Sequence, residues 1–160
     1  MNKRDLVLGL LNSGKPQTYI PAAFFLHFDP SCHFGRAALD KHLEFFRATG
    51  MDFVKIQYER NFPRLPGIQR ADDWNTMPLY GKEFFGPQLE VVEVIVKAVK
   101  RDAVVVVTLY SPFMCASHAV GEENVLHHLR ENPGAVIKGM EIVTESLMTY
   151  ALGRRIESAD

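Results

Sequence analysis

The sequence has little cysteine, almost no net charge and no long apolar run. Two cysteines among 160 residues, Cys32 and Cys115, are too few for the disulfide framework of a small secreted domain, which favours a reducing, cytoplasmic setting. A net charge of -1, without a cluster of lysine and arginine, argues against binding to nucleic acid through its phosphates. Since no segment approaches the roughly 18 consecutive apolar residues of a membrane span, we expect no membrane partner.

The first residues place basic side chains before a short apolar stretch, as a secretion signal does. Asp5 interrupts that stretch and Asn12 to Gly14 end it early, so a first amphipathic helix is the better interpretation. No repeat, linker or low-complexity tract follows. Because this length is ordinary for one domain and sufficient to bury a core, we expect a single domain over residues 1–160.

Three apolar runs suited to β-strands alternate with helical patterns. The runs cover residues 20–29, 52–59 and 103–110, and the unbroken β-branched third run predicts burial on both of its faces. Apolar residues at helical spacing predict a helix over 36–49, with Gly50 at the position of a C-cap glycine. This alternation is typical of α/β proteins with parallel strands and crossover helices.

Further helices are predicted at Leu89–Lys100, at about Glu122–Arg130 and at Pro133–Gly153, where Pro133 suits a first helical turn. Residues 60–88 form a long connection that is rich in proline, glycine and aromatic side chains and holds the only tryptophan, Trp74. Such connections are uncommon in compact domains. The sequence leaves two interpretations open, a lid or binding loop, or an insertion packed by its own aromatic residues.

Polar side chains stand at the ends of all three predicted strands. They are His27, Asp29, Gln57, Glu59, Tyr110 and Ser111. Because the carboxyl ends of parallel strands meet at one edge, where chemistry gathers in α/β sheets and barrels, we expect a site there. Strand alternation places Lys55, Gln57 and Glu59 on one face.

Glu59 and His27 are the candidate catalytic residues. A buried carboxylate can clamp a substrate or transfer a proton, and a histidine can act as acid or base. The alternatives are a Lys55–Glu59 pair that structures the interior and a hydrogen-bonded structural histidine. The candidate substrate-binding residues are Asp29, Gln57, Tyr110 and Ser111.

No metal or cofactor is predicted. Cys32 and His33 lie near His27 in the sequence, which suggests a metal site, but structural zinc sites show four ligands in paired spacings and this cluster does not. His127 and His128 are expected on the solvated face of a helix.

Several stretches together resemble the N-terminal half of the uroporphyrinogen decarboxylase superfamily. They are TYIPAAFFLHFDP, HLEFFRATGMDFVKIQYE, the DDW of the long connection, VVVVTLYSPFMCASHAVG and NPGAVIKGMEIVTESLMTYALG. The resemblance implies a (β/α)8 barrel and an activity of the decarboxylase or the corrinoid or thiol methyltransferase type. Such a barrel takes about 250 residues, so we expect a truncated barrel half with little activity alone.

The resemblance also bears on the substrate. Family decarboxylases carry arginines just after the first strand that bind the tetrapyrrole, and LHFDPSCHFGR has none before Arg36, which argues against a porphyrinogen. Glu59 aligns with the family aspartate at the end of the second strand. The zinc ligands of the methyltransferases belong to the distal half of the barrel.

The expected partners follow from the incomplete barrel. Open strand edges and apolar patches seek cover, so we expect a homodimer or a complementing chain around a site for a small-molecule substrate. Two alternatives remain open: a noncatalytic module for small-molecule binding or interaction, and a bare fragment.

Overall fold

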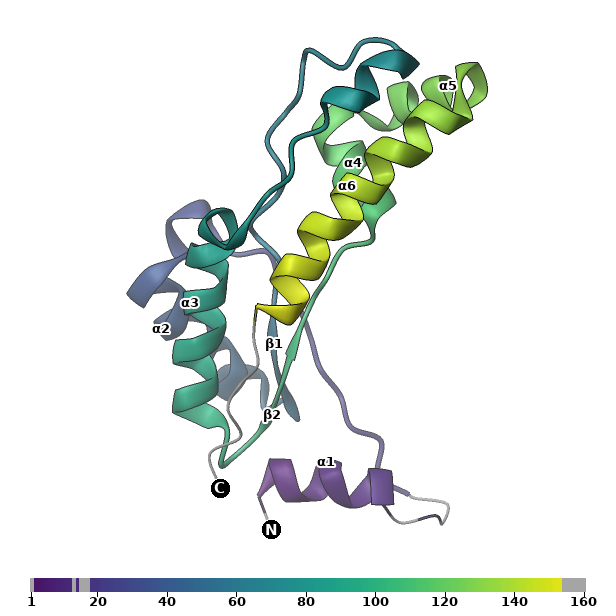
Figure 1. Ribbon diagram of the computed structural model, residues 1–160. Helices are drawn as coiled ribbons and strands as arrows, with labels where there is room; N and C mark the ends of the chain where they lie inside the picture. The colour runs from purple at the N-terminus through teal and green to yellow at the C-terminus, as the bar shows by residue number, and fades with distance from the viewer. Residues whose placement is uncertain (1, 13, 15–17, 154–160) are drawn as a thin grey trace. The chain divides into compact units, whose positions relative to one another are not determined.

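The computed structural model describes residues 2–12, 14 and 18–153 (Figure 1). The chain divides into two compact units, residues 1–59 with 90–108, and residues 60–89 with 109–160. No helix in the described ranges is both long and apolar enough to cross a membrane.

A two-stranded parallel sheet forms the centre of the first unit. Strand β1 (Phe53–Ile56) pairs with β2 (Val104–Val107), residue for residue from one end to the other. Helix α2 (Gly35–Thr49) precedes β1, and α3 (Lys82–Val99) precedes β2, as the crossover pattern predicts. The apolar phase of β1 is buried with these helices in a core of Ala38, Val54, Ile56, Val91, Val92, Ile95, Val99 and Ala103.

The local signals around α2 are confirmed. Gly50 adopts a left-handed conformation (φ 62°) directly after the helix, as a C-cap glycine does. Helix α1 (Lys3–Asn12) occupies the predicted opening helix. The Lys3 ammonium donates hydrogen bonds to the carbonyl oxygens of Gly50 and Met51, so it ties α1 to the end of α2.

The prediction of a strand over residues 20–29 is wrong, although the segment lies where that strand was expected. Ala22 exchanges hydrogen bonds with Asp52, Phe25 lies beside Lys55, and His27 lies beside Gln57. These pairs share one sequence offset, so the segment runs parallel to β1. A strand requires a continuous ladder; Pro21 has no N–H to donate, and residues 20–29 form no strand, although a backbone hydrogen bond runs from Asp52 N to Ala22 O (2.8 Å).

The third predicted strand is also less buried than its composition indicates. β2 covers only Val104–Val107, its first three residues are half-buried, and Val107 is exposed. The prediction of burial on both faces is therefore wrong. A β-branched run favours a strand but does not determine what covers it.

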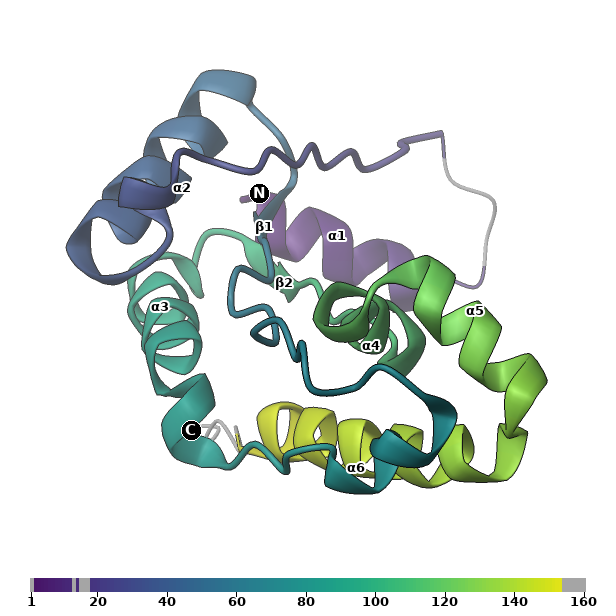
Figure 2. The same cartoon turned by 90° about the horizontal axis from the view of Figure 1, so that it is seen from above.

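Helices dominate the second unit, in which α4 (Pro112–Val120), α5 (Glu122–Glu131) and α6 (Pro133–Leu152) contact one another (Figure 2). The predictions of α5 and α6 are confirmed to within two residues. Helix α4 was not predicted, although Ser111 caps it and Pro112 stands at its first position.

Part of the long connection packs against a helix of the second unit. Its short 3₁₀ helix η2 (Ala71–Thr76) contacts α6, and Trp74 is fully buried. The Trp74 indole donates a hydrogen bond to Nδ1 of His128 (3.1 Å), which is buried on α5, so the prediction that His128 is solvated is wrong. Helix α3 begins at Lys82, seven residues earlier than Leu89, because it continues through Pro87.

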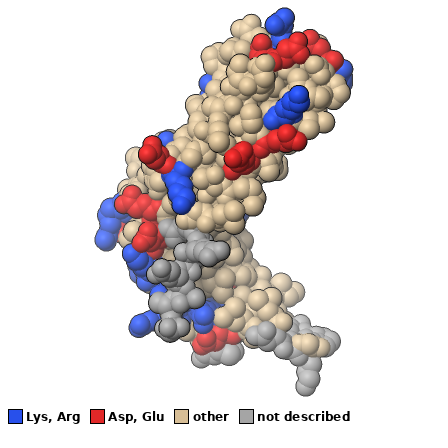
Figure 3. All heavy atoms as spheres, in the orientation of Figure 1, with Lys and Arg blue, Asp and Glu red and all other residues tan. Residues whose placement is uncertain are grey.

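Charged side chains are intermixed on the face shown in Figure 3. Among the described residues of that face, acidic and basic groups lie in small clusters, without a broad basic patch.

Candidate functional site

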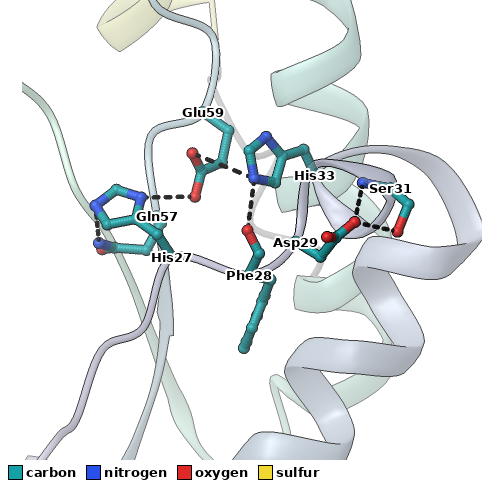
Figure 4. A network of polar contacts seen from close by, with 7 residues as sticks. All are labelled: His27, Phe28, Asp29, Ser31, His33, Gln57 and Glu59. Atoms are coloured by element: carbon teal, nitrogen blue, oxygen red, sulfur yellow. Dashed lines mark hydrogen bonds and ion pairs between the residues drawn. The ribbon is translucent and has the colours of Figure 1, made fainter.

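The candidate site lies beyond the carboxyl end of β1, where Glu59 meets His27. His27 Nδ1 lies 3.0 Å from Glu59 Oε1 (Figure 4). The Glu59 side chain is 8% exposed and the His27 side chain 51% exposed. A nearly buried carboxylate therefore supports an imidazole that solvent can reach, which is the arrangement of a general base and the group that orients it.

Gln57 and Thr108 extend this contact into a hydrogen-bonded chain. Gln57 Nε2 lies 3.3 Å from His27 Nε2, and the Thr108 hydroxyl donates to Gln57 Oε1 over 2.9 Å. Thr108 follows β2, and its N–H continues the sheet by bonding Ile56 O (2.9 Å). Parallel pairing thus brings the ends of both strands to one polar cluster.

His33 approaches Glu59 from the other side. Its Nε2 lies 2.9 Å from Phe28 O and 3.8 Å from Glu59 Oε2. A third histidine, His42 on α2, is buried against the Phe28 ring, with ring centroids 4.9 Å apart. Burial lowers the pKa of His42, and the hydrogen bond to Ala38 O and the Glu59 charge oppose that shift only in part. The neutral form of the His42 imidazole is therefore favoured.

The Asp29 side chain makes a local contact with Ser31 and is not bonded to Glu59 in Figure 4. Its carboxylate accepts hydrogen bonds from the N–H (2.9 Å) and hydroxyl (2.6 Å) of Ser31, and so caps the 3₁₀ helix η1 (Pro30–Cys32). These bonds, the hydroxyl first, lower the pKa of Asp29. Figure 4 shows the carboxylate turned toward Ser31.

Tyr110 and Ser111 belong to the second unit. Ser111 Oγ accepts a hydrogen bond from Met114 N (3.2 Å) at the start of α4. The Tyr110 ring lies edge-on to His118, with centroids 5.6 Å apart. Their assignment to substrate binding stays a prediction.

Lys55 lies on the same strand face as Gln57 and Glu59. Its ammonium stands 4.0 Å from the centroid of the Phe25 ring, and Phe25 in turn lies edge-on to His27 (6.4 Å). A cation over an aromatic ring is attracted by the electrons of the ring face. Lys55 thus contacts the Phe25 ring, whereas Glu59 contacts His27 and His33.

Among the described residues, no group of three or more His, Cys, Asp or Glu side chains is arranged to hold a metal ion. Two members of the cluster, His33 and Thr108, were not among the predicted site residues, although His33 was considered for a metal site. His33 follows the predicted strand in a loop, where periodicity says nothing. Thr108 could have been found, because it shares a strand phase with the candidate Tyr110.

The parallel sheet with its crossover helices defines an α/β protein, and the histidine–carboxylate pair lies at the edge where such folds place their sites. The family model for uroporphyrinogen decarboxylase (URO-D) matches residues 43–157, more than two thirds of the chain, and the chain belongs to this family. Gln57, Glu59 and Thr108 lie inside the matched range, and His27 precedes it. No curated protein and no solved structure matches the chain.

Proposed function

We propose that the chain supplies a proton-transfer pair, His27 and Glu59, to a decarboxylase or methyltransferase site of the uroporphyrinogen decarboxylase type. The observation that carries this proposal is the 3.0 Å contact between an accessible imidazole and a nearly buried carboxylate. The substrate class is a small molecule with a carboxylate, since that is what a decarboxylase consumes.

The pair suits the proton step of a decarboxylation. When the carbon–carboxylate bond breaks and carbon dioxide leaves, the electron pair remains on the substrate carbon, which must then take a proton. An imidazolium at His27 can donate it from Nε2, while Glu59 holds Nδ1 and stabilises the charged ring. In methyl transfer the same atom would take the proton of an acceptor thiol.

A complete site needs residues beyond this cluster. We propose that the two units belong to one domain that forms part of a (β/α)8 barrel, and that a second copy or a complementing chain completes it. In support, the segment beside β1 exposes Ile20, Phe24, Phe25 and Leu26, an apolar surface of the kind that partners cover. Both cysteines are free, which fits a reducing cytoplasm. Light scattering tests this proposal, because a monomer mass for the purified chain would contradict self-assembly.

One observation favours a second function, ligand binding without turnover. Gln57 stands at His27 Nε2, the atom through which a proton would pass to a substrate. A site of this kind would hold a ligand and release it unchanged.

The pairing of His27 with Glu59 can be tested by the nitrogen NMR shifts of the His27 ring. With Glu59 present, we expect neutral His27 to carry its proton on Nδ1. Glu59→Gln should move the proton toward Nε2, because an amide binds Nδ1–H more weakly than a carboxylate does. Glu44→Gln is the matched control, since Glu44 is an exposed carboxylate paired with Lys41. An unchanged tautomer in Glu59→Gln would refute the pair.

Turnover separates the two functions. Because LHFDPSCHFGR has no arginine before Arg36 to bind a porphyrinogen, the probes are smaller carboxylic acids as well as uroporphyrinogen, and carbon dioxide release is measured for the wild-type chain and for His27→Ala. Release that depends on His27 supports the decarboxylase. Saturable binding of the probe without carbon dioxide release supports the binding module. Binding that is equally tight in the wild type and in His27→Ala contradicts both functions.

A further inference from the structure

The Gln57 amide has a partner at each end, and while His27 is neutral the His27 ring determines the orientation of the amide. The Glu59 carboxylate can only accept, so the proton of neutral His27 lies on Nδ1 and leaves a lone pair on Nε2. That lone pair faces Gln57 Nε2 (3.3 Å), and Gln57 Oε1 faces the Thr108 hydroxyl (2.9 Å). In each of these three contacts a donor meets an acceptor.

Proton uptake breaks this match at one point. When His27 Nε2 takes a proton from water, the ring carries N–H groups at both nitrogens, and Nε2–H then points at the amide N–H of Gln57. Two donors 3.3 Å apart repel. Gln57 is buried, and its amide contacts His27 through Nε2 and Thr108 through Oε1, so a half-turn of the amide is the smallest change that restores the match.

We infer that Gln57 is a positioning residue whose amide reverses when His27 is protonated, with Thr108 as the partner that serves both orientations; this inference rests on the proposed function. In the reversed state, Gln57 Oε1 accepts from His27 Nε2–H, and Gln57 Nε2 donates to Thr108 Oγ1. Thr108 fits this role because a hydroxyl both donates and accepts. In the neutral state Gln57 covers the lone pair, and in the charged state it holds the proton in place for transfer.

The charged and titratable groups around this switch are few. Glu59 holds Nδ1 of His27, and Lys55 stands on the same strand face, over Phe25. His33 and His42 face Glu59 from the loop after η1 and from α2. Among the described residues named here, Gln57 is the one that contacts Nε2 of His27, so its amide determines which ring form is matched in that contact.

Gln57→Met tests the reversal through the sign of one shift. Methionine keeps the length of the side chain and removes both the donor and the acceptor. If the amide reverses, the wild-type carbonyl stabilises the imidazolium more than the amide N–H stabilises neutral His27, because bonds to charged groups are stronger. His27 in Gln57→Met should then reach half protonation at a pH lower by roughly half a unit. A fixed amide would repel the imidazolium, so its removal would raise that pH. A rise or no change overturns the inference.

Two further measurements keep the test decisive. Gln69→Met is the matched control, since Gln69 is exposed in the second unit, and it should leave His27 unchanged. Should Gln57→Met fail to fold, the side-chain amide signals of wild-type Gln57 are followed with pH. They should shift at the midpoint of the His27 ring, and signals that stay constant overturn the inference.

The outcomes also separate this inference from the proposed function. If the His27 tautomer is the same in Glu59→Gln as in the wild type, the proton-transfer pair itself is refuted. A tautomer that responds to Glu59→Gln, together with a raised midpoint in Gln57→Met, refutes only the reversal. Thr108→Ser keeps a hydroxyl and should preserve the pH-dependent shift of the Gln57 amide signals. Thr108→Val removes the hydroxyl and should make that shift smaller.

Discussion

Gly139 on α6 marks the closest approach of a helix to the buried Trp74, and an added methyl group there should destabilise the second unit. A Cβ at Gly139 would lie 2.6 Å from Trp74 Cε3 and 3.0 Å from the Trp74 carbonyl oxygen. Real Cβ atoms essentially never show a contact as short as 2.6 Å. The indole cannot turn away freely, because Trp74 is fully buried and its Nε1 is bonded to His128.

The magnitude follows from two opposing effects. Forcing an extra carbon into a packed interior costs about 1–3 kcal/mol. Replacing glycine by alanine inside a helix returns up to about 1 kcal/mol. The displaced indole also strains its 3.1 Å bond to His128. We therefore expect Gly139→Ala to lower the free energy of unfolding by about 1–2 kcal/mol.

The assay is urea unfolding followed by fluorescence, since Trp74 is the only tryptophan and reports on its own surroundings. Gly134→Ala on the same helix is the control. Its Cβ would meet only the Asn132 side chain, at an ordinary 3.6 Å, so that variant should be as stable as the wild type or slightly more stable. Gly139→Ala as stable as Gly134→Ala would refute the close approach.

Three further predictions concern ionisation and capping. The pKa of Asp52 is lowered mainly by the hydrogen bond from the Tyr19 hydroxyl and secondly by the one from Ala22 N. Asp52 therefore stabilises the fold above about pH 4, and this stabilisation is lost as the pH falls through the lowered pKa. Urea midpoints of Asp52→Asn should be lower than wild type at neutral pH and converge with it in acid; a constant gap would contradict this. Burial raises the pKa of the Cys115 thiol to about 11, so a thiol reagent near pH 8 should label only Cys32 until denaturant is added. Ser111→Ala should cost about 1 kcal/mol by removing the cap of α4, and an unchanged melting temperature would argue against that structural role.

The alternation of residues 52–59 was sufficient to predict the central strand and its two faces. Val54 and Ile56 point into the core, and the polar phase leads to Gln57 and Glu59, because a strand that packs against helices on one side must keep this period. The meeting of His27 with Glu59 was predictable because the two segments run parallel, although residues 20–29 do not form the predicted strand.

Other features depend on contacts that no local pattern records. The burial of His128 depends on Trp74, which is 54 positions away. Residues 20–29 have side chains that favour a β-strand, but this preference does not show whether their backbone groups form a continuous hydrogen-bond ladder. The start of α3 was hidden by Gly86 and Pro87, which normally interrupt helices.

The constant offset between the segment at His27 and strand β1 determines which changes of length the site can tolerate. The run from Ala22 to His27 matches the run from Asp52 to Gln57 in length, so deleting one residue inside either run would shift the register and turn His27 to the opposite face from Glu59. Residues added between the two runs would leave both registers intact. Natural or engineered variation in length should therefore accumulate around α2 and avoid the two runs.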